Sequence, residues 1–250
     1  MSTIGNHPAA STPTGEASPR RHAGRPSGGR RLARRLLQLY AGLVLYGVSM
    51  ALMIEAELGL DPWDVFHQGL SRRTGFSIGA VTIAVGALVL LLWIPLRQRP
   101  GLGTVSNVVV IGVAVDLALA LLPTVATLPA RIGFLAAGIV LNGVATGLYI
   151  GARFGPGPRD GLMTGFVARH PRHSIRRVRT VIELTVLAAG WILGGTVGVG
   201  TVAYALGIGP LVHWFIPMFT VRPPDGTPGP AEERRDRRAH RDQADTNCLQ

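Results

Sequence analysis

The sequence predicts an all-α membrane protein, a polytopic bundle of six transmembrane helices arranged as two inverted three-helix repeats. Apolar runs of about twenty residues, long enough to cross a bilayer, alternate with clusters of charge. The sequence of residues 40–116 is repeated in similar form at residues 136–213, and each copy holds three such runs. Because three is odd, the second copy must enter the membrane from the opposite side, a design found in many secondary transporters.

The internal repeat is defined by turn formers and small residues rather than by interchangeable aliphatic residues. Residues 40–73 and 136–169 are identical at about 14 of 34 aligned positions, well above what this composition gives by chance. The shared residues include Gly42/Gly138, Gly47/Gly143, Gly59/Gly155, Pro62/Pro158, Asp64/Asp160, Gly69/Gly165 and Arg73/Arg169. After one inserted residue, the match resumes with Ser77/Ser174, Gly101/Gly198, Thr104/Thr201 and Gly112/Gly209.

The six apolar runs are the expected spans, in chain order. They cover residues 36–56, 77–96, 104–123, 131–152, 178–196 and 201–219. Core helices of soluble proteins are usually shorter, so six long runs with almost no interior charge favour membrane spans. The first run is not expected to be a cleaved signal peptide, because about 35 residues precede it and no small-x-small cleavage site interrupts it. The two membrane repeats are therefore expected at residues 32–123 and 129–220.

The two ends of the chain differ in composition from the membrane repeats. Residues 1–31 are rich in Pro, Ser, Gly and Arg, and residues 221–250 are densely charged. Neither segment can bury a core, so both are expected to be disordered. For the C-terminal segment a solvated tail is the favoured interpretation, and contact with anionic lipid or a partner is the alternative.

The distribution of arginine predicts the orientation. All 25 basic residues are arginine, and the formal net charge is +11. With six spans and a cytoplasmic N-terminus, 22 of these 25 arginines fall on the cytoplasmic side. The charge therefore indicates a protein of the bacterial plasma membrane with both termini in the cytoplasm, and no nucleic-acid partner is expected. Cys248 is the only cysteine, so no intrachain disulfide can form.

A short broken segment follows the first span of each repeat. Pro62 and Pro158 suit the first position of a new helix, where the missing N–H costs nothing. Asp64 and Asp160 then fall in the first turn, against the positive end of the helix dipole. Each new helix is only about ten residues long, too short to span a bilayer.

Two arrangements of these short helices stay open. An amphipathic helix in the interface is favoured, because Trp63, Phe66 and Leu70 share one face while Asp64 and His67 face elsewhere. The alternative is a re-entrant half-helix in each repeat that points its N-terminus toward a central site.

Other glycine, serine and threonine residues mark helix ends. Gly59 and Gly155 suit the C-caps of the preceding spans, and Ser77 and Ser174 suit the N-caps of the following ones. The GxGT sequences at residues 101–104 and 198–201 predict tight turns between helices. A phosphate-binding loop is disfavoured, because no strand precedes these sequences and no lysine follows them.

Two acidic residues are best placed to lie below the lipid headgroups. Asp116 belongs to the third run and Glu183 to the fifth, and His213 aligns with Asp116 in the repeat. Burying a charge at membrane depth costs about 3 kcal/mol, so proton relay or ion binding is one interpretation. The alternatives are a position near the interface for Asp116 and pairing of Glu183 with Arg179 at i, i+4. His213 is expected to be a packed or interfacial histidine.

Gly143, Gly147 and Gly151 repeat every four residues along the fourth run and form a close-packing face. Packing of the first span on the fourth is the favoured use of this face. A homodimer through the same face is the alternative.

Taken together, these motifs resemble the YczE-like branch of the YczE/YyaS/YitT family of bacterial integral membrane proteins. The resemblance covers residues 32–220 and rests on LGLDPWD with Gly69, the GLGT turn, FGPGPRD with Gly165, and the glycine-rich sequence at 194–201. It implies a multi-pass bacterial membrane protein without an assigned activity. Arg159 stands where the first copy has Trp63, so a strictly symmetric site is not expected.

Two classes of function fit these observations. The first is a small secondary transporter or permease for an unknown small molecule, with the lipid bilayer as its surroundings. The second is a non-transporting membrane scaffold or regulatory protein. The sequence contains no nucleophile–base set, metal-ligand spacing or nucleotide loop, so neither an enzyme nor a metal or cofactor is expected. The candidate substrate- or ion-binding residues are Pro62, Trp63, Asp64, Pro158, Asp160, Asp116 and Glu183.

Overall fold

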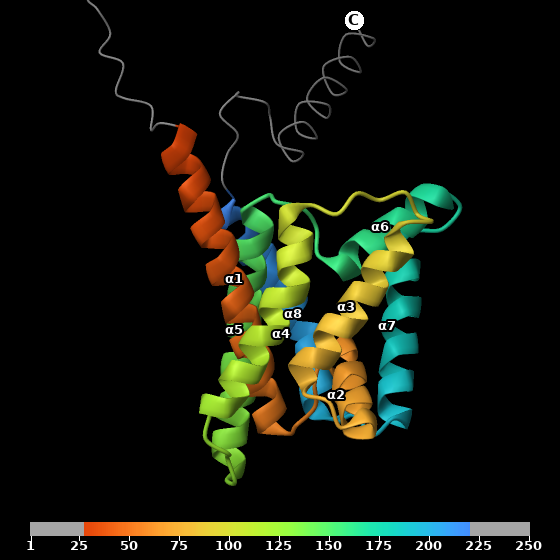
Figure 1. The fold of residues 1–250 in the computed structure, drawn as a ribbon. Coiled ribbons are helices and arrows are strands. Elements are labelled where there is room, and N and C mark those ends of the chain that lie inside the picture. Colours follow the sequence, from red (N-terminus) through yellow and green to blue (C-terminus); the bar gives the residue numbers. More distant parts are fainter. Residues whose placement is uncertain (1–27, 221–250) are drawn as a thin grey trace, which may run out of the picture.

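The computed structural model describes residues 28–220, and every regular element within that range is an α-helix. The predicted tails, residues 1–31 and 221–250, lie outside the described residues except for residues 28–31, which begin the first helix. Helices occur at all six predicted apolar runs and at both predicted short segments. Their bounds are α1 (Gly28–Ala56), α2 (Pro62–Thr74), α3 (Ile78–Trp93), α4 (Leu102–Leu121), α5 (Leu128–Gly151), α6 (Pro158–Arg169), α7 (Ile175–Ile192) and α8 (Val199–Phe219) (Figure 1).

Several of these helices have the length and hydropathy of membrane spans. Four of them, α1, α4, α5 and α8, are long and apolar enough to cross a bilayer. A fifth candidate is the pair α2 and α3, which is bent by 115° at the break between its members. By itself α3 has only 16 residues, and the first half of α7 contains Arg176, Arg177, Arg179 and Glu183. The prediction of a helical membrane protein is confirmed.

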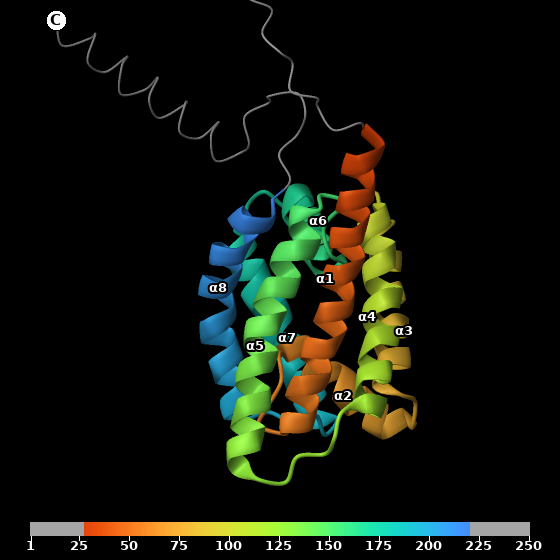
Figure 2. The same cartoon turned by 90° about the vertical axis from the view of Figure 1, so that its left-hand side faces the viewer.

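The helices form two groups that lie side by side (Figures 1 and 2). In one group, α1 packs along α5 and α4, and α5 packs along α8. In the other group, α2 packs mainly on α7, and α6 packs mainly on α3. The short helices α2 and α6 lie at opposite ends of the bundle, whereas the start of α1 and the end of α8 lie at the same end.

Close contact between α1 and α5 forms the centre of the first group. A Cβ added at Gly42 or Gly138 would lie 2.8 Å or less from an atom of the other helix, so glycine permits this approach. Between these glycines the fully buried Asn142 donates to Ser49 Oγ over 3.0 Å and accepts from the Tyr204 hydroxyl over 3.1 Å. The predicted packing of the first span on the fourth is therefore observed.

The glycine face of α5 packs mainly on α8 rather than on α1, and here the predicted partner is wrong. A Cβ at Gly143 or Gly147 would lie 2.8 or 2.9 Å from a side-chain atom of α8. A Cβ at Gly151 would lie 2.5 Å from the carbonyl oxygen of Phe219, where α8 ends, and 3.1 Å from Gln38 of α1. The reason is helical register. The face toward α1 includes Gly138, five positions before Gly143, which is a rotation of about 140° around the helix.

The expected C-cap role of Gly59 and Gly155 is also wrong. Both helices end earlier, at Ala56 and Gly151. The first residue with a left-handed backbone conformation after each helix is Glu57 (φ 51°) and Arg153 (φ 57°), respectively. Gly59 and Gly155 have φ of 115° and 120° further along each loop. Sequence spacing alone does not separate a glycine at the end of a helix from a glycine with positive φ in the loop that follows.

Each of these two loops is attached to the beginning of a distant helix. A Cβ at Gly59 would lie 2.7 Å from Thr201 Oγ1, and a Cβ at Gly155 would lie 2.9 Å from Thr104 Oγ1. Backbone hydrogen bonds accompany these contacts: Gly200 N donates to Leu58 O (2.7 Å) and Gly103 N donates to Phe154 O (3.0 Å). The GxGT sequences are thus helix starts that receive the loops before α2 and α6, which fixes where these short helices begin.

Candidate functional site

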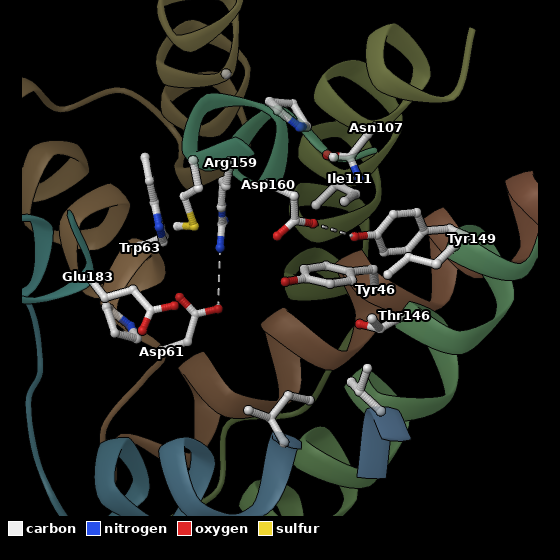
Figure 3. A pocket seen from close by; sticks show the side chains of 18 of the residues that line it. Tyr46, Asp61, Trp63, Asn107, Ile111, Thr146, Tyr149, Arg159, Asp160 and Glu183 are labelled. Carbon is white, nitrogen blue, oxygen red and sulfur yellow. Dashed lines mark hydrogen bonds and ion pairs between the residues drawn. The ribbon is translucent and has the colours of Figure 1, made fainter. Parts of the chain in front are cut away.

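A cavity of about 420 Å³ lies in the middle of the bundle, and all eight helices contribute to its lining (Figure 3). Its polar lining residues are Tyr46, Asp61, Trp63, His67, Thr82, Asn107, Thr146, Tyr149, Arg159, Asp160, Arg179, Glu183, Tyr204 and His213. Cavities of this size hold small organic molecules in other proteins. The cavity therefore combines the volume of a ligand site with an unusual density of ionisable groups for the interior of a membrane bundle.

The N-termini of α2 and α6 both reach this cavity. Pro62 and Pro158 are the first residues of the two helices, as predicted, and both line it. Asp61 is the N-cap of α2 and accepts from Asp64 N over 2.8 Å, whereas the N-cap of α6 is Gly157, which has no side chain to offer. The two helix starts are thus similar in backbone and different in charge.

Arg159 connects the two halves of the chain across the cavity. Its guanidinium lies 3.5 Å from Asp61 Oδ2 and 3.4 Å from Asp64 Oδ1, and it sits 5.1 Å from the centre of the Trp63 ring. Both carboxylate side chains are almost fully buried, at 3% and 0% exposure. Buried carboxylates need a partner, since leaving one unpaired costs several kcal/mol. Arg159 therefore holds α6 to the start of α2.

Asp160 faces the cavity from the opposite wall to Asp61 (Figure 3). The Tyr149 hydroxyl donates to its Oδ2 over 3.5 Å, and no arginine or histidine within residues 28–220 forms an ion pair with it. The rings of Tyr149 and Tyr46 meet edge to face, with their centroids 6.3 Å apart. A carboxylate and two aromatic rings thus share one side of the cavity.

Glu183 lies on the α7 side of the cavity and is paired. Arg179 Nε lies 2.7 Å from Glu183 Oε1, the i, i+4 pairing that the sequence offered as an alternative to proton relay. Both residues line the cavity, and the Glu183 side chain is 33% exposed. The pair brings one positive and one negative charge to the same wall.

Three buried polar atoms of α2 have no hydrogen-bond partner in the part of the chain that the structure describes. They are Trp63 Nε1, His67 Nδ1 and Asp64 Oδ2, each in a buried side chain. Trp63 and His67 line the cavity, but Asp64 does not. The interfacial arrangement of this helix would place Asp64 and His67 away from the protein, yet they are only 1% and 2% exposed. These polar groups are instead directed into the bundle.

Asp116 has a different position and a local role. Its carboxylate accepts from Ser77 Oγ over 2.6 Å and from Gly79 N over 2.8 Å, so it caps the first turn of α3. It is not among the residues that line the cavity, whereas His213, its aligned counterpart in α8, is. Asp116 is therefore separate from the other predicted site residues, and its two hydrogen bonds account for a half-buried carboxylate in an apolar run.

The sequence indicates only part of the lining. Asp61 precedes a helix-starting proline and is recognisable as an N-cap candidate, but Tyr46 and Tyr149 lie within apolar runs and carry no local signal. In the sequence, Arg159 is notable only because it differs from Trp63, its aligned residue in the first copy of the repeat. Its ion pairs depend on two segments about 95 positions apart, which pattern reasoning does not bring together. Within residues 28–220, no cluster of His, Cys, Asp and Glu has the arrangement of a metal site.

Comparison with known proteins places the chain among bacterial membrane proteins. The family described as "Family of unknown function (DUF6198)" matches residues 33–217. An uncharacterised protein of Haemophilus influenzae is 39% identical over 178 residues, which cover 71% of this chain and 81% of that protein. The uncharacterised membrane protein YczE of Bacillus subtilis is 35% identical over 181 residues, which cover 72% and 84% of the two chains.

A more distant relative is the uncharacterised protein YyaS of Bacillus subtilis, 26% identical over 181 residues, or 71% of this chain and 90% of that protein. No solved structure matches the chain. The resemblance to the YczE-like proteins is therefore confirmed, and the name of one relative agrees with the helical membrane architecture.

Proposed function

The chain belongs to the family of unknown function DUF6198, and from this premise we propose that it is a small secondary transporter that binds its substrate in the central cavity. The observation that carries the proposal is the meeting of two interrupted segments at one polar cavity. Pro62 and Trp63 of α2 line it together with Pro158, Arg159 and Asp160 of α6, and these two short helices lie at opposite ends of the bundle. Interrupted helices in corresponding positions of two halves form the substrate site in many secondary transporters.

The proposal includes six spans, α1, α3, α4, α5, α7 and α8, in two inverted repeats. Corresponding contacts in the two halves support it. Gly47 of α1 packs on α4 as the aligned Gly143 of α5 packs on α8. The bond from Gly103 N to the loop before α6 has its counterpart in the bond from Gly200 N to the loop before α2. In this arrangement α2 and α6 are re-entrant half-helices that enter from opposite faces.

The orientation in the bacterial plasma membrane follows from charge. The start of α1 and the end of α8 lie at one end of the bundle, together with α6 and the arginine-rich segment before α7 (Figure 1). Arginine is enriched in cytoplasmic loops, so this end is proposed to face the cytoplasm.

Transport is favoured over scaffolding because burying charged groups around a cavity is energetically unfavourable. A scaffold gains nothing from burying carboxylates and arginines around an open volume, since an apolar core is at least as stable. A transporter needs such groups, because they bind and release a polar solute at membrane depth. The site residues in this account are Asp61, Trp63, Arg159 and Asp160, with Asp64 as the buried partner of Arg159.

Proteoliposomes test the proposal directly. Purified protein is reconstituted, a metabolite panel is supplied with and without an imposed proton gradient, and solute uptake is measured by mass spectrometry. We expect uptake of at least one solute, and loss of about tenfold or more in Asp160→Asn. The control is Glu57→Gln, a loop carboxylate paired with Arg131 and 56% exposed. Folded wild-type protein that moves no solute in either direction would favour the scaffold function instead.

A further inference from the structure

We propose that the ligand of the cavity is a small organic cation with a hydrogen-bond acceptor, bound at Asp160 between the cavity wall of Tyr46 and Tyr149 and the indole of Trp63. Binding is inferred from the cavity itself. Only the statement that this ligand is carried across the membrane rests on the proposed function.

The charges around the cavity leave one carboxylate without a cationic partner. Arg159 is engaged by two carboxylates, Asp61 and Asp64, and Arg179 is engaged by Glu183 at 2.7 Å. Within residues 28–220, Asp160 forms no ion pair. With all carboxylates ionised, these six groups carry four negative and two positive charges. A cation in the cavity would reduce this excess, whereas an anion would increase it.

Asp160 is positioned to use such a cation. Its one side-chain partner in the described part of the chain is the Tyr149 hydroxyl, at 3.5 Å, which is a long and neutral hydrogen bond. An ionised carboxylate with only a neutral partner in a partly buried site gains more from a bound cation than an exposed carboxylate does. In Figure 3 this carboxylate is directed toward the open centre of the cavity.

The aromatic rings beside Asp160 add a second contribution. Tyr46 and Tyr149 lie edge to face with centroids 6.3 Å apart, so ring surface borders the cavity next to the carboxylate. Aromatic faces attract organic cations by about 0.5–2 kcal/mol. The protein already uses this combination nearby, because Arg159 sits over the Trp63 ring while its charge is met by Asp61 and Asp64.

An independent observation points to an acceptor on the ligand. Trp63 is 6% exposed and lines the cavity, yet its indole Nε1 has no hydrogen-bond partner among residues 28–220. An indole N–H can only donate, so a buried one gains by meeting an acceptor. His67 Nδ1 is a second buried polar atom at the cavity: it lies 3.4 Å from Asp64 Oδ1 but forms no hydrogen bond with any residue in the described part of the chain. A hydroxyl or carbonyl oxygen on the ligand would accept from the Trp63 indole, and a hydroxyl could also bond His67 Nδ1 in either tautomer.

The volume sets the size of the ligand. About 420 Å³ is far more than an inorganic ion needs, and it suits an organic molecule of modest size. Apolar lining residues such as Val85, Ile111 and Ile208 accommodate its hydrocarbon part.

Binding of matched probes tests the charge preference. Detergent-purified protein is titrated by calorimetry with choline, its neutral isostere 3,3-dimethylbutan-1-ol and the carboxylate 3,3-dimethylbutanoate. A second set is phenethylammonium, 2-phenylethanol and phenylacetate. We expect at least one cation to bind about tenfold more tightly than its neutral and anionic counterparts. Equal binding within both sets, no binding of either cation, or tighter binding of a carboxylate would overturn the inference.

Variants locate the bound cation. Asp160→Asn should lower cation affinity by about tenfold and leave the affinity of the neutral isostere unchanged, while Asp160→Glu should retain the preference. Glu57→Gln serves as the control with full affinity. Unchanged cation binding in folded Asp160→Asn would contradict the assignment to this residue. The experiments distinguish failure of the transporter proposal from failure of the cation proposal. A cation that binds but is not transported would contradict the transporter function, and transport of an anion would contradict the cation preference.

Discussion

The helix pairs α3–α4 and α7–α8 occupy corresponding places in the two halves of the chain but differ in how closely they pack. α3 and α4 are in extensive contact, whereas α7 and α8 are not packed against each other. In the first pair a Cβ at Gly86 would lie 2.9 Å from Val108, and a Cβ at Gly112 would lie 2.5 Å from Ile83. Glycine therefore sets the short distance between these two helices.

The second pair carries charge where the first pair has glycine. In the alignment that matches Ser77 with Ser174, Gly79 corresponds to Arg176 and Gly86 corresponds to Glu183. Larger side chains at these positions do not permit the same approach. Both pairs line the cavity, but α7 presents Arg179 and Glu183 to it, whereas the cavity-lining residues of α3 carry no charge. The comparison teaches that glycine permits close packing of one pair, whereas charged side chains stand at the aligned positions of the other pair, which is not closely packed.

The largest expected effect concerns the ion pairs that join the halves. Arg159→Gln leaves Asp61 and Asp64 buried without a cation, which should cost about 3–5 kcal/mol of stability. Thermal unfolding in detergent measures the loss. Adding Asp64→Asn should recover a large part of it, because one buried charge is then removed. Independent, additive losses in the double variant would show that these groups do not form one network.

The next effect tests the closed pair. Gly86→Glu introduces the residue that α7 has at the aligned position, Glu183, and places it against Val108 of α4. Overpacking and burial of a charge should then lower the free energy of unfolding by about 3 kcal/mol or more. The reciprocal change, Glu183→Ala, should cost about 1 kcal/mol or less, because its ion pair is 33–58% exposed. Folded yield and unfolding temperature report both. Equal losses at the two positions would remove the distinction between the pairs.

A smaller effect is expected where α5 meets α8. A Cβ added at Gly147 would lie 2.9 Å from the Cβ of Phe215, so Gly147→Leu should clash with this residue and should cost about 1–3 kcal/mol. The matched control is Gly133→Leu on the same helix, where no atom lies within 4 Å of an added Cβ. Solubilised yield of the two variants can be compared directly. Equal yields would place Gly147 toward lipid.

The smallest effect is expected at the cap of α3. Asp116→Asn weakens the bonds from Ser77 Oγ and Gly79 N and should cost about 1 kcal/mol. Because Asp116 does not line the cavity, ligand affinity should stay at the wild-type level in the same calorimetric titration. A loss of affinity similar to that of Asp160→Asn would return Asp116 to the binding site.

The sequence predicts the helices well and the site only in part, for different physical reasons. Helix starts depend on local chemistry, so the predictions at Pro62, Pro158, Ser77 and Ser174 are confirmed. Partners across the bundle depend on helix rotation, which a stretch apolar on every side does not encode. That is why the sequence assigns the Gly147 face to α1 instead of α8.

The charged site shows the same division. Pro62, Trp63, Pro158, Asp160 and Glu183 line one cavity, as the interrupted segments suggested. Asp116 is not separable from them by sequence, because a capping carboxylate and a carboxylate in a cavity both interrupt an apolar run in the same way. Only the three-dimensional positions of the residues around it distinguish the two.

The central claim is that the two halves enter the membrane from opposite sides, so that α2 and α6 approach the cavity from opposite faces. Single cysteines at Thr74, where α2 ends, and at His173, before α7, test it in a Cys248→Ser background; both residues are exposed. Whole cells are labelled with a membrane-impermeant maleimide before and after permeabilisation. Our account predicts that residue 74 reacts from outside and residue 173 only after permeabilisation. Reaction of both residues from the same side would contradict it.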